Sequence, residues 1–506
     1  MKPISIRHFT SGRPPRWLDR TLDIAMRIIP PAALVAIGAL FAAQQAVAPN
    51  QRAIKALVMM GLMALMFRFD MVYSVYLFAL LFPFPSGISI GSSNTVLMTI
   101  IPMIWAIRAT SAKIAISRKS PLDAAIAVFL LAHVIALINI SDVPTLVRNI
   151  EVIWRQAAAC TFFYMIFLFV NTEEKLFRLV KIASFACFLV MSTAVLELFF
   201  PGTTIIPGWI GLANKLGEGT LSRRVQGLRV GGSFESHGML ADFGTQLILF
   251  MAFFFLRARN PAEKAFWLAA VGTTVVAILA TANRGATAGL LVGLLFALVY
   301  FRRAIGPARL VLLVGGLLVG LGVLDTFMSQ HTIAVSVLDR FTHTEFEGVV
   351  PDTRTMTWKP ALLDGLKSPL FGSGPFYDTG VGLTKRYWPH NGYIFFFCTL
   401  GLFGLGAFLW VMGKVYQESR LWRHPALRGT PLRTLMTLSQ IWLFVLAFEQ
   451  LRTDHQRDAI YPHIVWMCFG VVTAGAAIAR RRIAEQSVAD AQGAVAGNRP
   501  VTSMKS

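Results

Sequence analysis

The sequence predicts an all-α, polytopic integral membrane protein, a helical bundle of about 12–14 transmembrane helices. Of its 506 residues, 55% are hydrophobic and only 14% are charged, and the mean hydropathy is +0.60. Soluble domains carry about 25% charged residues, so this deficit indicates lipid as the solvent. The formal net charge of +21 does not indicate a nucleic-acid binder, because long apolar runs separate the cations. A cytoplasmic bias of Lys and Arg explains it better.

Ten apolar runs are long enough to cross a hydrocarbon core of about 30 Å. They fall near 28–48, 121–140, 178–200, 239–256, 264–281, 285–301, 307–324, 391–416, 433–450 and 459–479. Four shorter runs are candidates for tilted or re-entrant helices, and they fall near 53–67, 71–85, 95–108 and 157–170. Counting them gives 14 spans.

The basic residues test this count, because connections alternate between the two sides of the membrane and Lys and Arg concentrate on the cytoplasmic side. With 14 spans, the basic segments all fall on the cytoplasmic side: the N-terminal lead, 109–120, 257–264, Arg302 with Arg303, 417–432, and the tail that begins with Arg480. The uncharged connection 84–94 falls outside, and so do two long connections, 201–238 and 325–389. We therefore expect both termini in the cytoplasm and a large external loop.

The chain divides into three regions. Residues 1–27 form a basic cytoplasmic lead without a convincing signal cleavage site, and residues 28–484 form the membrane domain. Residues 485–506 are small and polar, which predicts a disordered cytoplasmic tail. Four cysteines lie inside apolar runs, without the pair spacing of metal or redox sites, and we expect them to be core residues: Cys160, Cys187, Cys398 and Cys468.

Three arginines and one histidine fall at the external boundary, where the charge bias predicts few cations. They are Arg229 in GLRVGGSFESHG, Arg284 in TANRGATAG, Arg354 in PDTRTMTWKPAL and His390 in RYWPHNGY. Arg284 lies in a very short turn between two apolar spans, where an unpaired buried guanidinium costs on the order of several kcal/mol. It therefore needs an anionic ligand, lipid headgroups, or an acidic partner such as Asp242 or Glu197. The small residues around it leave room for a bulky ligand or for close helix contact.

His390 follows a proline and opens the span at 391, so it lies at a helix N-terminus, where free N–H groups favour anions. A neutral imidazole there could accept a proton from a sugar hydroxyl, or His390 could be only a cap-region residue. Asn391 could cap the helix or orient a substrate. Trp358 and Tyr387 belong to an aromatic-rich loop around Arg354 and could hold sugar rings, although any interfacial loop attracts aromatic residues.

Further polar residues on the external side are candidates for supporting the site, with structural salt bridges as the alternative: Glu235, His237, Arg452, Asp454 and His455. No Asp-x-Asp motif or carboxylate cluster on this side suits Mg²⁺. The sequence therefore predicts neither a metal site nor a cofactor.

Four elements in their order resemble the superfamily of O-antigen ligases and of O-antigen and exopolysaccharide polymerases. They are R-x-G-G-S-F before a span, T-x-N-R-G-A-x-A-G between two spans, D-T-R-x-x-x-W followed by P-L-F-G-S-G-P in a large loop, and P-H-N-G-Y opening the next span. The resemblance covers about 225–416. It departs from the family at Glu235 and Ser236, where relatives often have Pro-Asn.

The resemblance implies a bacterial inner-membrane glycosyltransferase with a GT-C-like fold and a periplasmic active site. Family members transfer a glycan from a polyprenyl pyrophosphate carrier to an acceptor hydroxyl, without a metal. The residues that match the family's catalytic and arginine motifs are His390, Arg284, Arg354 and Arg229. We expect the first three to be catalytic, and we expect the pyrophosphate and glycan to be bound by Arg229, Asn391, Trp358 and Tyr387.

The implied partners are a polyprenyl-pyrophosphate-linked oligosaccharide as donor, a carrier-linked glycan or the lipid A core as acceptor, membrane lipids, and other polysaccharide assembly proteins. No nucleic acid is expected. Because the external loops are extensive, we favour a polymerase of exopolysaccharide, capsule or O-antigen over an O-antigen ligase, which uses the same chemistry. A lipid-linked sugar flippase is a further alternative, since transporters place ionisable groups near the bilayer midplane. The clear midspan candidate, His133, fits an interhelical hydrogen bond better.

Overall fold

The computed structural model describes residues 70–83, 98, 100–107, 119–199, 230–232, 234, 236–305, 307–330, 336–342, 346–347, 350–377, 388–458 and 460–497. This part of the chain is almost entirely helical, with two strands of two residues each. Eight of its helices are long and apolar enough to cross a membrane, and two shorter apolar helices, Met71–Leu81 and Asp123–Asn139, accompany them. The predicted all-α polytopic membrane bundle is confirmed.

The described helices follow the predicted apolar runs in order. The first are α3 (Met71–Leu81), α5 (Asp123–Ile135) with the 3-10 turn η2 (Ala136–Asn139), α6 (Val143–Phe169) and α7 (Glu173–Phe199). Next come α10 (His237–Arg257), α11 (Pro261–Ala280), α12 (Arg284–Ile305), α13 (Pro307–Gln330) and α14 (Val337–Thr342). The antiparallel pair β1 (Phe346–Glu347) and β2 (Val350–Pro351) leads into α15 (Asp352–Gly365). The last elements are α16 (Gly392–Ser419), η4 (Arg420–Arg423), η5 (Pro425–Leu427), α17 (Pro431–Gln450), η6 (His455–Arg457) and α18 (Tyr461–Gly497).

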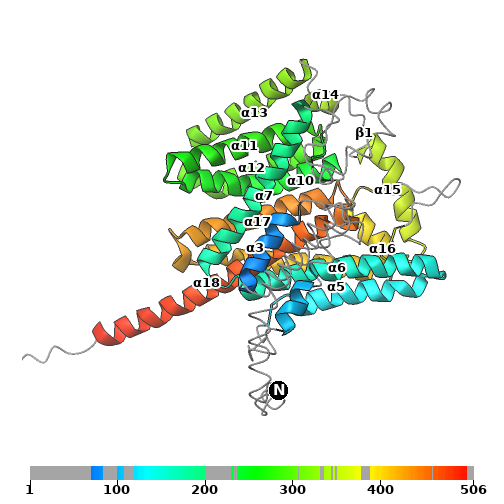
Figure 1. Cartoon of the computed structure of the whole chain (residues 1–506), viewed down its shortest axis with the longest axis horizontal. Coiled ribbons are helices and arrows are strands. Elements are labelled where there is room, and N and C mark those ends of the chain that lie inside the picture. The colour runs from blue at the N-terminus through cyan, green and yellow to red at the C-terminus, as the bar shows by residue number, and fades with distance from the viewer. Residues whose placement is uncertain are drawn as a thin grey trace, which may run out of the picture.

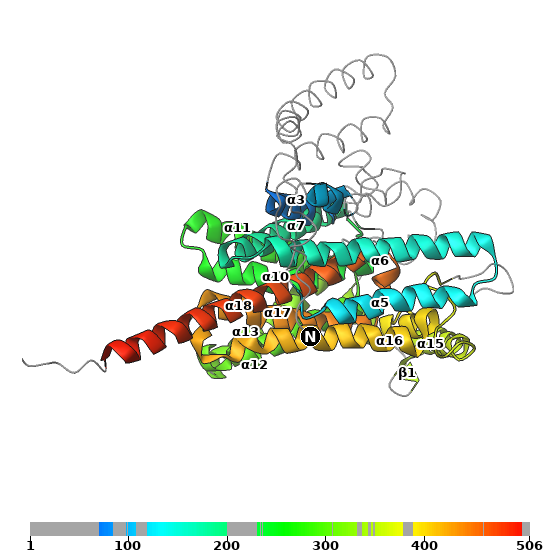
Figure 2. The same cartoon turned by 90° about the horizontal axis from the view of Figure 1, so that it is seen from below.

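Consecutive long helices run in opposite directions, so the bundle has two distinct ends. Figure 1 shows that the helices α10, α12, α16 and α18 begin at the end where α7, α11 and α17 finish, and we call this the site end. Figure 2 shows α15 at this end beside the start of α16, with α5 running along α16 and α6 along α5. The other end, which we call the distal end, contains the basic stretch of α18 that begins at Arg480.

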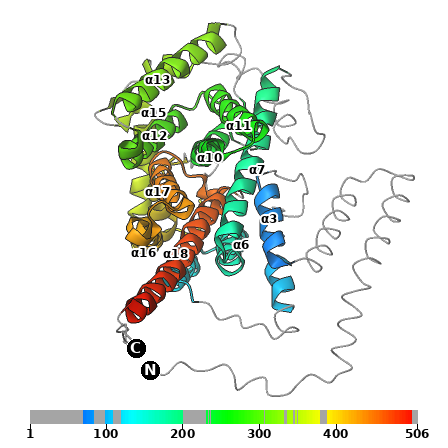
Figure 3. The ribbon, with the colours of Figure 1, turned by 90° about the vertical axis from the view of Figure 1, so that its left-hand side faces the viewer.

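Helix α18 forms the centre of the bundle. It packs against α6, α16 and α17, and its most apolar stretch is entirely buried inside the protein. Figure 3 looks along the bundle and shows α18 between α6 and α17. A buried, apolar α18 holds the connection 451–460 in place, and this connection supplies several residues of the candidate site.

The run predicted near 157–170 is confirmed as part of a helix that could span the membrane, but its predicted start is wrong, because these residues are the second half of the 27-residue helix α6. The helix begins after Asp142, whose side chain accepts a hydrogen bond from the Thr145 N–H at 2.8 Å. Arg148, Glu151 and Arg155 interrupt the apolar run but not the helix, because their spacing places them along one side of it.

The disordered tail predicted from 485 is also wrong in its first part, since α18 continues as a helix to Gly497. Alanine and other good helix formers are frequent in this segment, and they prolong the helix beyond the apolar span. The external loop predicted at 325–389 begins later, because α13 extends to Gln330. The predicted cytoplasmic lead and the apolar runs near 28–48 and 53–67 lie outside the described residues.

Part of the predicted external loop inserts beside α16 instead of remaining above it. Helix α16 is interrupted at Gly401, where φ is 69° and ψ is −169°. The segment 369–374 pairs with the backbone groups that this break frees: Ser373 N donates to Cys398 O at 3.0 Å, Gly374 N to Thr399 O at 3.0 Å, Leu402 N to Pro369 O at 2.8 Å, and Phe403 N to Leu370 O at 3.1 Å. Irregular backbone at membrane depth is tolerated where protein satisfies its hydrogen bonds. The P-L-F-G-S-G-P element therefore anchors the large loop to the bundle.

Replacing Gly401 by alanine is expected to destabilise the protein strongly. A Cβ atom there would overlap the backbone carbonyl of Leu370, and the positive φ adds strain. We expect a loss of about 2–4 kcal/mol, visible as a lower Tm in detergent. Gly413→Ala is the matched control, because it lies on the same helix with nothing within 4 Å of a Cβ atom. Equal Tm values for the two variants would contradict the packing described.

Candidate active site

The turn between α11 and α12 places Arg284 at the site end. Ala282 adopts a positive φ of 49°, which lets the chain reverse within three residues. The Asn283 side chain then accepts a hydrogen bond from Ala286 N at 3.1 Å and so caps α12. Arg284 is the first residue of α12, and its side chain is half-buried. The predicted very short turn between two apolar spans is present.

Arg452 occupies part of the space left by the small residues after Arg284. Its side chain lies against Gly285, where a Cβ atom would come within 2.8 Å of one terminal nitrogen and 2.9 Å of Nε. The guanidinium is paired with Asp242 on α10, lies 3.8 Å from the Glu449 carboxylate, and donates to the Asn283 side chain at 3.4 Å. At Gly285, therefore, the small residue permits a close contact within the protein.

Burial alone lowers the pKa of Arg452, but the carboxylates of Asp242 and Glu449 outweigh it and raise the pKa above its usual value. Both carboxylates are fully buried. Asp242 thus forms an ion pair with Arg452. The sequence suggested Asp242 as a partner for Arg284. Glu197, the other suggested partner, accepts hydrogen bonds from Gly231 N and Gly232 N. Arg452 is thus a permanently charged group fixed by two buried acids.

Gly285→Ala is expected to displace the Arg452 guanidinium, because the added methyl group overlaps the Arg452 side chain. Since displacement by about 1 Å can cost up to 100-fold in rate, we expect a fall of about 10- to 100-fold in the activity of the site. Gly289→Ala, one turn further along α12, is the control, because its Cβ would meet Thr245 at an ordinary 3.4 Å. Activity assays on both variants after matched purification would check this. Full activity of Gly285→Ala would rule out a role for the Arg452 position.

His390 and Asp454 form a polar pair at the start of α16. Asp454 Oδ2 accepts a hydrogen bond from His390 N at 3.1 Å, and its Oδ1 lies 3.6 Å from His390 Nδ1. Asp454 is fully buried, whereas 44% of the His390 side chain is exposed. His390 has a positive φ of 48°, a conformation that is uncommon outside glycine. The backbone and the carboxylate together hold an accessible imidazole in a defined position.

The pKa of Asp454 is lowered to about 2: burial raises it, but the hydrogen bond from His390 and the charge of Arg457 prevail. The depressed pKa means that the carboxylate is ionised well below neutral pH. Its contribution to stability is present above about pH 4 and is lost as the pH falls through 2. Arg457 also lies over the Trp388 ring, 3.9 Å from its centroid. This contact holds the loop before α16 against the connection 451–460.

Asn391 caps α16, as one of its two predicted roles requires. Its Oδ1 accepts hydrogen bonds from Tyr393 N at 3.0 Å and Ile394 N at 3.1 Å, and its Nδ2 donates to Leu451 O at 2.9 Å. The side chain is buried. Asn391 therefore fixes the start of α16 against the end of α17, and the described contacts use its amide for this purpose.

Arg354 reaches the same region from α15. The pKa of the Arg354 guanidinium is lowered, mainly because the side chain is buried. The charge of Asp454 opposes this shift, and the charges of Arg452 and Arg284 add to it. Arg354 is therefore exposed to the positive charges of Arg284 and Arg452 as well as to the negative charge of Asp454 at this end of the bundle. Trp358, one turn along α15, has a buried indole N–H without a hydrogen-bond partner in the described part of the chain. It is available to a ligand oxygen.

Of the remaining predicted site residues, the structure describes His455 and His237 but not Arg229, Glu235 or Tyr387. His455 is buried, with Nδ1 3.2 Å from Asp458 and Nε2 3.9 Å from Asp242. Burial lowers its pKa, but Asp458 and Asp242 outweigh this effect and raise it. His237 is the first residue of α10, after the Ser236 cap. Three predicted site residues lie outside the described residues: Arg229, Glu235 and Tyr387.

Comparison with known protein families finds a match to part of the chain. Residues 265–409 match the family model described as O-antigen ligase. This part of the chain is therefore similar to O-antigen ligases. No individual curated protein matches the chain. The match supports the resemblance predicted from the sequence and, in general terms, a ligase- or polymerase-type function.

The matched segment, 265–409, contains Arg284, Arg354 and His390, but several residues near them lie outside it. Asp242 precedes the segment, and Glu449, Arg457 and Asp458 follow it. No role was predicted for Glu449, Arg457 or Asp458. One signal was present: acids and bases are concentrated in the short connection after an apolar span. Glu449 lies near Arg452, Arg457 near Asp454, and Asp458 near His455. The packing of α10, α16 and α17 brings these local pairs to Asp242 and His390.

Within the described residues, no group of three or more His, Cys, Asp or Glu side chains is arranged to hold a metal ion. The four cysteines are free and buried, as the sequence predicted for core residues. At the site end, the described acidic side chains form pairs with arginines and histidines.

Proposed function

We propose that the chain is a glycosyltransferase that moves a glycan from a polyprenyl pyrophosphate carrier to an acceptor hydroxyl at the site end of the bundle. One observation carries the proposal: Arg284, Arg354 and the His390–Asp454 pair lie at one end of a membrane bundle, and Arg284, Arg354 and His390 belong to the segment that matches the O-antigen ligase family. The site end then faces the periplasm of the bacterial inner membrane, with both termini in the cytoplasm. The basic stretch of α18 at the distal end supports this orientation.

The arginines suit the leaving group. When the bond between the anomeric carbon and the carrier oxygen breaks, its electron pair remains on the pyrophosphate, and the added negative charge needs stabilisation in the transition state. A guanidinium matches phosphate oxygens with two parallel N–H donors and stays charged at any working pH. In this proposal Arg284 and Arg354 receive the pyrophosphate in place of a divalent ion.

His390 suits the acceptor. The acceptor oxygen forms the new bond to the anomeric carbon while its proton passes to the imidazole, and the proton is later released to water. Asp454, fixed beside Nδ1, favours the tautomer in which Nδ1 carries the hydrogen and Nε2 is the free base. A single direct displacement inverts the configuration at the anomeric carbon.

The acceptor decides between a polymerase and a ligase. We favour a polymerase of exopolysaccharide, capsule or O-antigen, because a growing carrier-linked chain would use the extensive loops at the site end. The description of the matching family favours the second candidate, an O-antigen ligase acting on the lipid A core. A deletion strain separates the two. Short or missing polymer indicates a polymerase, and uncapped core with accumulated carrier-linked glycan indicates a ligase.

Reconstitution tests the chemistry itself. Purified protein in lipid vesicles would receive a defined polyprenyl pyrophosphate oligosaccharide and an acceptor, with and without a chelator. We expect transferred glycan of inverted configuration in equal amounts under both conditions. Loss of product with the chelator would overturn the role of the arginines, and no product with any acceptor would overturn the enzyme. The interhelical hydrogen bond predicted for His133 is wrong, because its imidazole hydrogen-bonds the Phe129 carbonyl of its own helix at 2.9 Å. A flippase remains a less well supported alternative, because the matching family is described as O-antigen ligase.

A further inference from the structure

A basic pocket lies at the distal end, far from the candidate active site. Its volume is about 660 Å³, and it opens among the C-terminal end of α10, the end of α12, and the start of α17. Its lining includes three arginines and three aromatic residues: Arg257, Arg428, Arg433, Tyr300, Phe301 and Trp422. None of its lining residues is acidic.

The residues that the structure describes do not neutralise the positive charge of this pocket. Within the described part of the chain, no ion pair joins Arg257, Arg428 or Arg433 to a carboxylate. Arg257 lies over the rings of Phe177 and Phe253 at 5.5 Å, and Arg433 over Trp422 at 5.7 Å. Stacking occupies the face of a guanidinium and leaves its N–H edge to bind an anion.

The start of α17 adds a further attraction for anions. Thr430 caps this helix by accepting a hydrogen bond from Arg433 N at 3.2 Å, and Pro431 occupies its first turn. Gly429 precedes the cap with a positive φ of 75° and nothing within 4 Å of a Cβ atom, so the backbone is open there. The positive end of the helix dipole therefore points to the same pocket as the three arginines.

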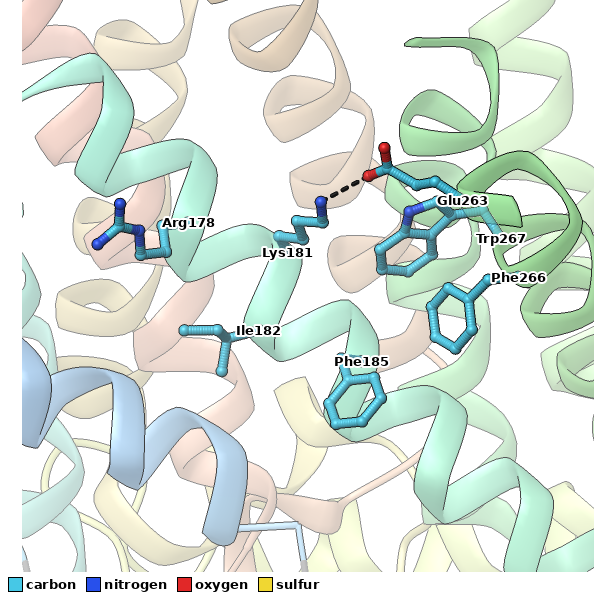
Figure 4. A pocket seen from close by; sticks show the side chains of 7 residues that line it. All are labelled: Arg178, Lys181, Ile182, Phe185, Glu263, Phe266 and Trp267. Atoms are coloured by element: carbon cyan, nitrogen blue, oxygen red, sulfur yellow. Dashed lines mark hydrogen bonds and ion pairs between the residues drawn. The ribbon is translucent and has the colours of Figure 1, made fainter. Parts of the chain in front are cut away.

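In a second pocket at the distal end, shown in Figure 4, the basic residues are paired with acidic ones. It measures about 460 Å³ and lies between α7 and α11. Lys181 pairs with Glu263 at 2.6 Å, as Figure 4 shows, and Arg178 pairs with Glu174 at 2.7 Å. Each of its cations has an acidic partner. The uncompensated charge of the α10–α17 pocket is therefore not a general property of this end.

We propose that the α10–α17 pocket binds the phosphate headgroup of an anionic phospholipid. The shared chemistry is a phosphate ester held by guanidinium groups, and the surroundings indicate a lipid as its source. Leu256, directly before Arg257, is 77% exposed on a helix that crosses the membrane, so the rim of the pocket meets acyl chains. Arg428 and Gly429 are exposed at the helix ends, at the level where headgroups lie. This site is independent of the proposed glycosyl transfer.

The test is lipid binding by the full chain, measured by native mass spectrometry in detergent with phosphatidylglycerol or phosphatidylcholine added. Because each arginine near a membrane surface contributes roughly fivefold, we expect Arg428→Gln/Arg433→Gln to weaken phosphatidylglycerol binding about 30-fold and Arg257→Gln about fivefold. Arg178→Gln, in the compensated pocket, is the matched control and should change binding by less than about twofold.

Three results would overturn the proposal. They are unchanged phosphatidylglycerol binding by the double variant, equal binding of phosphatidylcholine by the unaltered protein, and displacement of the lipid by inorganic phosphate at the same concentration. The last result would show that free phosphate is the ligand. If the double variant does not fold, as judged by its elution and Tm, Arg257→Gln carries the test, because that residue lies at the exposed end of α10.

Discussion

Replacing Arg284 by alanine is expected to abolish detectable glycan transfer while the protein still inserts in the membrane. The arginine opens α12 at the site end, beside Arg354 and Arg452. Removing one preorganised donor from a developing negative charge typically costs about 10²–10³ in rate. Arg354→Ala should have a similar effect. Lysine at either position keeps the charge but not the paired donors, so its activity should fall between those of the alanine variant and the unaltered protein.

The size of this effect follows from the environment of the arginines. At an effective dielectric constant near 20, two unit charges about 4 Å apart gain about 4 kcal/mol before desolvation, compared with about 1 kcal/mol in bulk water. Two such contacts therefore supply a substantial part of the stabilisation that the departing pyrophosphate needs. Polymer or ligated lipopolysaccharide from a complemented deletion strain measures the loss. Arg259→Ala, exposed at the distal end, is the control and should restore the product. Normal product from Arg284→Ala would refute the leaving-group role.

Much of the fold is readable from the sequence because the membrane imposes simple rules. Apolar runs of about 20 residues become spanning helices, and basic residues mark one side. The same rules bring out Arg284 and His390, since a cation or an imidazole at the other side breaks the pattern. The structure places both at one end of the bundle. Position relative to the membrane was enough to place them together.

The supporting contacts could not be predicted in this way. Asp242 lies on α10, whereas Glu449 and Arg452 are three residues apart at the end of α17, and the packing of α10 against α17 brings Asp242 to Arg452. Sequence spacing carries no information about such a pairing. The insertion of 369–374 into the break of α16 is a similar case, because Gly401 resembles any other glycine in an apolar run. Hydrophobic pattern predicts which segments are buried, but not which irregular segment fills a particular gap.

Asp454→Asn is expected to lower the turnover of glycan transfer by about 10²–10⁴, with little change in the KM for the donor. The buried carboxylate faces His390 Nδ1 at 3.6 Å and accepts the His390 backbone N–H at 3.1 Å. An asparagine preserves the shape and can still accept the backbone hydrogen bond. Its amide group can, however, donate to Nδ1, which moves the imidazole hydrogen to Nε2 and removes the base. Asp454 is therefore a positioning residue that acts through His390.

Kinetics and stability together distinguish this positioning role from a structural one. If Asp454 acts through His390, the double variant His390→Ala/Asp454→Asn should be no slower than His390→Ala alone, because the two residues work as a unit. A purely structural role would instead give additive losses, a lower Tm, and weaker donor binding in Asp454→Asn. The carboxylate is ionised throughout the neutral range, so its removal should lower the rate by the same factor at every pH between about 6 and 9. A loss confined to one end of that range would show that another group is responsible.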